Sequence, residues 1–323
     1  MSLPISSTTG YSSAMINSGV ISNKGVELAL DAEIIKARDF TWSANVNFAR
    51  NINKVESLHP ELKEYPLAEA RWAGAMIEAV EGEAFGAILG KKLLRNPDGE
   101  VIYGSNGYPL VGSKLEVLGN GVYDWTAGIG TSLSWKGLSL SALFDVKWGA
   151  DVYSMSDMMA CGNGTSLRTL EGREAWYASE EQRKAANVQI SDWTPTGGYV
   201  GKGVVNVGTE DNPVWETNQT PVDPQKYWAY FQSAGTPEPF IYDASFIKLR
   251  ELTLSYSLNK KWLARTPLTG VSLSVYGRNL WTLYSNLPNI DPESSYNNGN
   301  GQGFEYGSLP SRRAWGFSVR LSF

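Results

Sequence analysis

Two pairs of acidic residues are the clearest candidates for catalysis in this chain of 323 residues. Glu81 and Glu83 form the first pair, and Asp291 and Glu293 form the second. Glycoside hydrolysis requires two carboxyl groups that flank the bond to be cleaved. Both pairs lie in loop-like sequence, and their spacing alone cannot establish that geometry. We therefore interpret these carboxylates as solvated groups or loop braces, and we predict no catalytic residue and no enzymatic activity.

Residues that commonly bind metals or cofactors are sparse. His59 is the only histidine and Cys161 the only cysteine, which disfavours a histidine-based metal site and excludes an intrachain disulfide. The dipeptide Asp98-Gly99 lacks the alternating oxygen ligands of a calcium loop and predicts a plain turn. Gly128 and Gly130 lie inside an alternating strand, which argues against a dinucleotide fingerprint. We expect neither a metal nor a cofactor.

Aromatic residues crowd one long segment, residues 149–243. Exposed rings of this kind stack on sugars or become buried against a partner protein. A segment of this length also needs a small core of its own, so internal packing is the simpler interpretation of the same rings. The candidates for ligand or partner contact are Trp176, Tyr177, Trp193, Trp215, Tyr227 and Trp228.

The composition favours strands and turns over helices. Charged residues make up only 19% of the chain, whereas Gly (33), Trp (12) and Tyr (16) are abundant. The net charge of -5 gives no indication of a nucleic-acid partner. Because no stretch approaches about 18 consecutive apolar residues, any membrane crossing must be made by strands closed into a barrel.

Apolar and polar residues alternate along much of the chain, most clearly at its end. Trp315, Phe317, Val319, Leu321 and Phe323 occupy every second position. Since successive side chains of a strand point to opposite faces, such a segment is apolar on one side and polar on the other. The pattern predicts about nine or ten strands, of which nine cover approximately residues 26–34, 40–48, 84–95, 100–111, 125–133, 138–146, 252–256, 271–275 and 315–323.

The connections between these strands differ in length in a regular way. Short turns are expected at residues 36–39, 96–99 and 136–137, with a medium one on the same side near 258–270. Longer segments are expected at residues 53–83, 149–243 and 282–311, with a medium connection at 112–124. Outer-membrane barrels combine short periplasmic turns with long extracellular loops. We therefore predict an all-β fold, an antiparallel up-and-down transmembrane β-barrel portion whose Phe323 lies on the periplasmic side.

Several motifs resemble the carboxyl-terminal barrel of SusC/RagA-type TonB-dependent transporters. They stand in family order and span nearly the whole chain. The motifs are Ile21-Ser-Asn-Lys-Gly-Val-Glu-Leu28, residues 119–137, residues 242–256 with Phe246-Ile-Lys-Leu-Arg-Glu-Leu252, Gly277-Arg-Asn-Leu-Trp281, Asp291-Pro-Glu293, Leu309-Pro-Ser-Arg-Arg313 and the terminal Phe323.

The resemblance implies a 22-stranded barrel with an amino-terminal plug, energised through TonB and the proton gradient. It also implies a SusD-like surface lipoprotein as partner, glycans or peptides as substrates, and the outer membrane of a Gram-negative, Bacteroidetes-like cell. The chain departs from the full pattern, since no plug, TonB-contacting segment or export signal is recognised. We expect residues 1–323 to be the carboxyl-terminal part of the barrel, unable to transport by itself.

Two other interpretations stay open at this point. A soluble carbohydrate-binding or carbohydrate-degrading β-sandwich also excludes charge from its inner face, although it has little reason to keep its longest connections on one side. An adhesin-like surface barrel without import differs from the transporter by lacking a plug. Phe40, Trp42, Tyr256, Trp281 and Trp315 are expected near strand ends, as parts of interfacial aromatic girdles.

Overall fold

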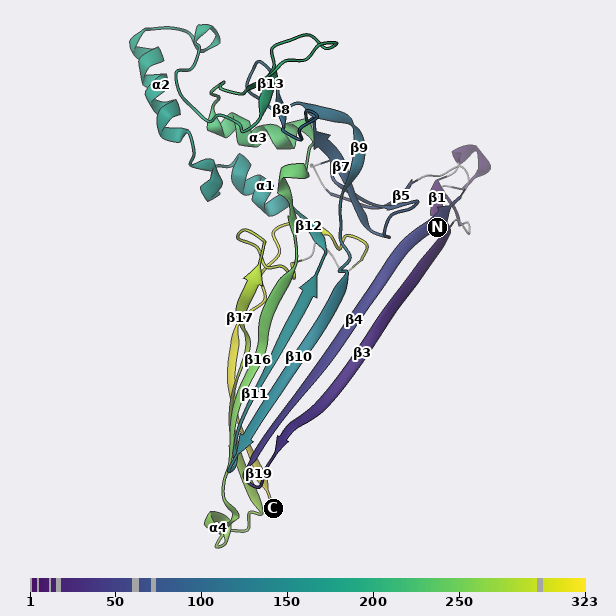
Figure 1. Ribbon diagram of the computed structural model, residues 1–323, viewed down its shortest axis with the longest axis vertical. Coiled ribbons are helices and arrows are strands. Elements are labelled where there is room, and N and C mark those ends of the chain that lie inside the picture. Colours follow the sequence, from purple (N-terminus) through teal and green to yellow (C-terminus); the bar gives the residue numbers. More distant parts are fainter. Residues whose placement is uncertain are drawn as a thin grey trace.

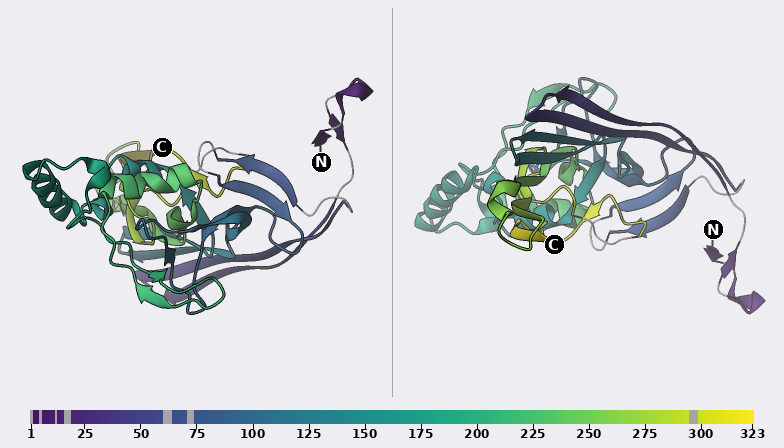
Figure 2. Two further views of the ribbon diagram at one scale, coloured as in Figure 1. Left: turned by 90° about the horizontal axis from the view of Figure 1, so that it is seen from above. Right: turned by 90° about the horizontal axis from the view of Figure 1, so that it is seen from below.

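The computed structural model describes residues 2–4, 6–11, 13–15, 19–59, 64–70, 74–294 and 299–323. Its main feature is one long sheet that carries a folded cap at its upper end (Figure 1). The sheet consists of β3 (Gly19–Lys36), β4 (Phe40–Leu58), β10 (Trp125–Trp135), β11 (Leu138–Trp148), β16 (Phe246–Ser257), β17 (Gly270–Ser285) and β19 (Ala314–Ser322). Seen along its length, the sheet is curved rather than flat (Figure 2).

The strands of this sheet form an up-and-down meander. Their order is β19-β17-β16-β11-β10-β4-β3, and every neighbouring pair is antiparallel. Residues 37–39, 136–137 and 258–269 connect strands at the lower end, where the carboxyl terminus and α4 (Lys260–Leu263) also lie (Figure 1). The long connections 59–124, 149–245 and 286–313 all lie at the upper end. The predicted separation is confirmed for these connections, but the prediction was wrong for the short turn at 96–99, which lies within the long connection 59–124.

The main sheet contains seven of the nine strands expected from the sequence. The segments expected at 84–95 and 100–111 lie in the cap instead, on either side of the predicted turn at 96–99. The turn at 96–99 is followed by a single β-bridge, between Arg95 and Val101, and not by a long hairpin. The hairpin is short because the chain turns again at residues 104–107. The long partner of β7 (Ala87–Leu93) is β9 (Val111–Asn120), within the segment expected to be a connection.

The register of the main sheet aligns the apolar positions of all its strands. One row contains Ile35, Trp42, Leu133, Leu140, Leu254, Val275 and Phe317, each paired with the next. The opposite face is polar, with hydroxyl pairs such as Ser134 with Ser139 and Ser255 with Ser274. Phe317 on the apolar face is 80% exposed. A continuous, uncovered apolar face of this kind is typical of strands that face lipid.

Two rows of aromatic residues bound the apolar face. The upper row is a stack of Phe48, Trp125, Trp148 and Tyr284, with successive ring centroids 5.9, 5.9 and 5.4 Å apart. The lower row contains Phe40, Trp135 and Tyr256 in register. Strand β10 runs for 11 residues from one row to the other, which matches the about 9–11 residues of a tilted membrane-crossing strand.

The lower row includes two of the five residues expected in aromatic girdles, Phe40 and Tyr256. Trp281 and Trp315 lie between the rows and not in them, although Trp315 is near a strand end as expected, being the second residue of β19. Trp281 pairs with Leu249, and Trp315 pairs with Gly277. Strand β17 continues beyond Trp281 and Gly277 to Ser285, so neither of these two residues is at the upper edge of the sheet. Trp42 lies one step above the lower row, in the row of Leu133.

The cap is built from the three long upper connections (Figure 1). Its helices are α1 (Met155–Gly162), α2 (Arg173–Ala185) and α3 (Pro224–Ala234). Its strands are β5 (Glu64–Glu69), β6 (Met76–Val80), β7, β8 (Ile102–Tyr103), β9, β12 (Asp151–Ser154), β13 (Val204–Asn206), β14 (Trp215–Thr217), β15 (Ile241–Asp243) and β18 (Phe304–Glu305). Two short strands, β1 (Ser2–Pro4) and β2 (Ser13–Met15), pair near the amino terminus.

The cap has its own hydrophobic core, which draws on all three connections. Fully buried members include Ile88, Tyr153, Met158, Phe240 and Phe304. Short 3-10 turns complete the cap or precede it, at Ser7–Thr9, Leu167–Thr169, Ile190–Asp192 and Glu238–Phe240. Within the described part of the chain, no helix is long and apolar enough to cross a membrane.

The assignment of faces predicts opposite effects for two substitutions in the middle of the sheet. Ile129→Arg puts a cation on the apolar face between the aromatic rows, and should lower the free energy of unfolding in lipid by about 2–4 kcal/mol. Ser141→Arg puts the same cation on the polar face, beside the Glu251 carboxylate, and should change it by about 0.5 kcal/mol or less. Urea unfolding of the full-length protein in lipid vesicles measures both, and equal losses would contradict the assignment.

Candidate functional site at the upper end of the sheet

Lys248, near the upper end of β16, is buried in a cluster of charged residues. Its ammonium Nζ lies 2.5 Å from Asp291 Oδ1 and 2.8 Å from Glu293 Oε2. The lysine side chain is only 3% exposed. Because a buried cation is tolerated only when it is paired and hydrogen-bonded, these two carboxylates are required for Lys248 to occupy this position.

Arg250 forms the second half of the same cluster. Its guanidinium binds Asp145 on β11, with Nη2 2.5 Å from Oδ2, and also binds both carboxylate oxygens of Glu293. The register between β16 and its neighbours shifts at this point, on the β11 side and on the β17 side. Such a bulge re-aims a side chain, and here it allows Arg250 to reach Asp145.

Asp291 ties the same cluster to a second part of its loop. Its Oδ2 accepts hydrogen bonds from the backbone N–H and hydroxyl of Ser311, at 2.8 and 2.5 Å. The backbone N–H of Glu293 donates to its Oδ1. The interpretation of Asp291 and Glu293 as loop braces is confirmed. Glu81 and Glu83, the other candidate pair, are both exposed at a tight turn that follows β6.

The charged cluster lowers the pKa of each of the two loop carboxyl groups. For Asp291, burial works to raise the pKa, but hydrogen bonds from Lys248 and Ser311 outweigh it and hold the pKa far below its usual value. For Glu293, burial likewise opposes the bonds from Arg250 and Lys248, and the net pKa is again lowered. Both groups are therefore anionic at neutral pH, which preserves their attraction to the two cations.

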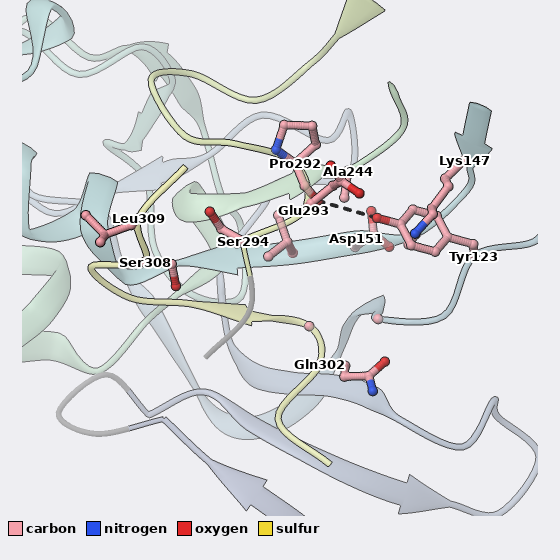
Figure 3. A pocket seen from close by; sticks show the side chains of 14 residues that line it. Tyr123, Lys147, Asp151, Ala244, Pro292, Glu293, Ser294, Gln302, Ser308 and Leu309 are labelled. Carbon is pink, nitrogen blue, oxygen red and sulfur yellow. Dashed lines mark hydrogen bonds between the residues drawn. The ribbon is translucent and has the colours of Figure 1, made fainter. Parts of the chain in front are cut away.

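A cavity of about 580 Å³ lies beside the cluster, between the sheet and the loop 286–313 (Figure 3). Its lining mixes apolar residues such as Val152 and Leu309 with the polar side chains of Tyr123, Lys147 and Glu293. Lys147 Nζ lies 5.5 Å above the ring of Tyr123, whose hydroxyl donates to the Pro292 carbonyl at 3.5 Å. Burial, and then the nearby carboxylates, raise the pKa of Tyr123 to about 12. The cavity offers hydrogen-bonding groups to a polar ligand.

Sequence reasoning did not single out Lys248, Arg250, Asp145 or Lys147. The alternation along the strand could have identified Lys248 and Arg250. Lys248 and Arg250 share even numbering with Leu252 and Leu254, so a regular strand would place both cations on the apolar face. This conflict predicts a bulge or a buried ion pair at that point.

The six aromatic candidates of segment 149–243 do not come together at one site. Tyr227 and Trp228 are buried in the cap core. The Tyr227 hydroxyl bonds that of Tyr103 at 3.0 Å, and the Arg168 guanidinium lies 4.4 Å above the Trp228 ring. Internal packing therefore accounts for these two rings.

The other four candidates lie nearer the surface of the cap. Trp176 is half-buried on α2 and Tyr177, beside it, is 65% exposed. Trp193 is half-buried and donates through Nε1 to Ser179 on α2. Trp215 is half-buried on β14. Ligand or partner contact stays a prediction for these rings.

Residues capable of metal or redox chemistry are not gathered in the described part of the chain. Among the described residues, no group of three or more His, Cys, Asp and Glu side chains could hold a metal ion. Cys161 is buried on α1 beside Asp157. Burial, followed by the Asp157 charge, raises the pKa of its thiol to about 11, so the reactive thiolate is scarce at neutral pH.

Comparisons with known proteins agree with this architecture. No family model matches the chain. It is 25% identical to TonB-dependent receptor P3 of Formosa agariphila, over 99% of this chain and 30% of that protein. It is 24% identical to TonB-dependent receptor P26 of the same organism, over 100% of this chain and 31% of that protein. The predicted resemblance is confirmed.

Solved structures show that the fold is shared with the RagAB peptide transporter. One such structure matches 99% of this chain and 31% of its own, with a TM-score of 0.61 and 21% identity. The open-open state of the RagAB peptide importer matches 100% of this chain and 31% of its own, with a TM-score of 0.64 and 20% identity. The chain thus spans about 30% of the length of the TonB-dependent receptors it resembles.

Removal of the buried lysine should loosen the loop that it holds. In Lys248→Ala, Asp291 and Glu293 lose their shared cation, and we expect the free energy of opening of residues 286–294 to fall by about 3–5 kcal/mol. The matched control is Arg278→Ala, which removes a 63% exposed ion pair with Glu251 on the same sheet and should cost about 1 kcal/mol or less. Hydrogen exchange of the full-length protein distinguishes them, and equal protection in both variants would contradict the anchoring role.

The lowered pKa values also predict a dependence on pH. Unfolded Asp and Glu titrate at about 3.9 and 4.3. Since the folded values are lower, the stabilisation is fully present above about pH 5 and is lost as the pH falls through the folded values. We expect the Tm of the full-length protein to decrease once the pH is below about 4. The Asp291→Asn variant should have a lower Tm at pH 7, and its Tm should decrease less on acidification.

Calorimetry across pH 3 to 8 checks this expectation. Asp98→Asn, at an exposed turn, serves as the control and should follow the unsubstituted protein throughout. An Asp291→Asn curve parallel to that of the unsubstituted protein would show that this carboxyl does not carry the acid sensitivity.

Proposed function

We propose that this chain forms the carboxyl-terminal part of the barrel of an outer-membrane TonB-dependent importer. The observation that carries the proposal is the apolar face of the seven-stranded meander, bounded by aromatic rows and uncovered by any other described element. Similarity to TonB-dependent receptors along 99% of the chain supports the same conclusion. In this proposal the apolar face contacts lipid and the polar face lines the transport path.

We infer the class of substrate and the partner of the importer from the proteins that the chain resembles. The RagAB structures are described as a peptide transporter and importer, and the proposed substrates here are glycans or peptides. A SusD-like surface lipoprotein is the proposed partner at the cap. A plug domain elsewhere in the complete protein would connect transport to the TonB complex. No step in this function requires a catalytic residue in residues 1–323.

The charged cluster and its cavity have a defined place in this proposal. In this proposal they lie at the upper mouth of the barrel, since Lys248 and Arg250 are near the upper end of β16 and the cavity beside them is lined by residues of the cap (Figure 3). Lys248 and Arg250 hold Asp291 and Glu293 of the connecting loop against the wall. The polar side chains in the mixed lining of the 580 Å³ cavity, Lys147 and Glu293 among them, could contact a hydrated solute that passes from the cap into the barrel.

The soluble β-sandwich is the weaker alternative. A sandwich buries its apolar faces between two sheets about 10 Å apart. Among the described residues, no second sheet packs against the apolar face, and Trp315, Phe317 and Phe323 are all more than 65% exposed on it. Such a surface would drive aggregation in water.

The full-length protein should fractionate with the outer membrane and migrate differently on a gel before and after boiling. Uptake of radiolabelled oligosaccharides or oligopeptides by cells that carry it should stop when a protonophore collapses the proton gradient. A deletion strain complemented with the intact gene provides the control. A soluble protein with unchanged gel mobility would end the barrel proposal, and uptake insensitive to the protonophore would end the TonB-dependent one.

A further inference from the structure

Positive charge is concentrated at the lower end of the sheet (Figure 1). The three short connections there contain five cations and a single carboxylate, that of Asp39, whereas the whole chain has a net charge of -5. Strand β3 ends beside them with Lys36 and Glu33, which pair with each other at 2.8 Å and add no net charge. We call the five cations the lower basic surface: Arg38, Lys136, Lys260, Lys261 and Arg265.

All five cations of the lower basic surface are exposed to solvent. In the described portion of the chain, none of them forms an ion pair. Charges of one sign that are grouped at one end of a molecule attract a surface of opposite charge. The complement of this end of the sheet is therefore an anionic surface.

Aromatic rings lie directly beside these cations. Trp135, in the lower aromatic row, is 55% exposed, and the Nζ of Lys136 lies 5.5 Å from the centroid of its ring. On α4, Trp262 is 67% exposed and follows two of the lysines, whereas its neighbour Leu263 is buried. The buried leucine anchors α4 to the protein while the indole ring of Trp262 stays outside it.

We propose that the lower basic surface binds the headgroups of anionic phospholipids in the leaflet that surrounds this end of the barrel. The inference rests on the proposed function, because it requires the apolar face of the sheet to lie in a bilayer. Tryptophan rings prefer the headgroup level of a membrane, and lysine and arginine beside them are attracted to anionic lipid phosphates. Trp135 and Trp262 supply the rings, and the five cations supply the charge.

The arrangement of the cations favours a lipid surface over an acidic protein. They are distributed over three connections, which join β3 to β4, β10 to β11 and β16 to β17, and so extend across the width of the sheet. A layer of headgroups contacts such a row along its whole length. The row also continues directly from the apolar face, since Trp135 bounds that face and Lys136 follows it in the chain.

Native mass spectrometry of the full-length protein tests the proposal. The protein is released from detergent after incubation with an equimolar mixture of phosphatidylglycerol and phosphatidylcholine that have identical acyl chains. We expect it to retain more phosphatidylglycerol than phosphatidylcholine. The double variant Lys260→Gln/Lys261→Gln should lower the ratio of the two retained lipids by about fivefold or more, because each lysine near the surface attracts the anionic lipid.

The matched control removes two exposed lysines from the cap. Lys202 lies shortly before β13 and Lys226 lies on α3, both at the opposite end of the molecule from α4 (Figure 1). The double variant Lys202→Gln/Lys226→Gln changes the net charge by the same amount. It should leave the lipid ratio unchanged within about twofold, because attraction to anionic lipid decays within a Debye length of the headgroups. Circular dichroism verifies that both double variants fold.

Equal retention of the two lipids by the unsubstituted protein would overturn the proposal, as would equal lipid ratios in the two double variants. Binding of soluble polyglutamate without any excess of phosphatidylglycerol would also overturn it, and would assign the surface to an acidic protein. The failure of this inference differs from that of the proposed function. A protein that shows heat-modifiable gel mobility but no lipid preference loses only the headgroup site, whereas a soluble protein loses both.

Discussion

The register of the seven-stranded sheet is the constraint on which the rest of the structure depends. Side chains alternate between faces with a period of two, so a slip of one residue would exchange the apolar and polar faces of a strand. The row from Ile35 through Leu140 to Phe317 shows that all seven strands agree. This agreement leaves one face apolar and uncovered, which makes lipid its natural environment.

The register is broken in a controlled way where the sheet meets the loop 286–313. Lys248 and Arg250 are at even-numbered positions of β16, as its apolar residues are. The register shift beside Arg250 places both cations on the polar face, where Asp145, Asp291 and Glu293 neutralise them. A buried charge is costly unless it is paired, so the loop and the strand hold each other in place. Two motifs that are distant in the sequence, around residues 248 and 291, are thereby in direct contact.

The cap follows a different principle from the sheet. Its chain segments are too long to stay unstructured, and they bury their own aromatic rings, Tyr227 and Trp228 among them. Composition could predict that such a core was needed, but not which rings would enter it. Tyr177 stays outside because α2 contacts the rest of the cap through few positions, with Ser179 as its one buried residue.

The sequence by itself determined the strand pattern, the two faces of the sheet and the end at which the long connections lie. These are local properties, because a period of two and a turn signal can be recognised from neighbouring residues. Only the tertiary structure decided that residues 84–111 belong to the cap and that Lys248 pairs with carboxylates 43 and 45 residues away. Such pairings depend on register shifts and on the path of long loops. The local sequence indicates them only where charged residues occupy positions that the alternation assigns to the apolar face.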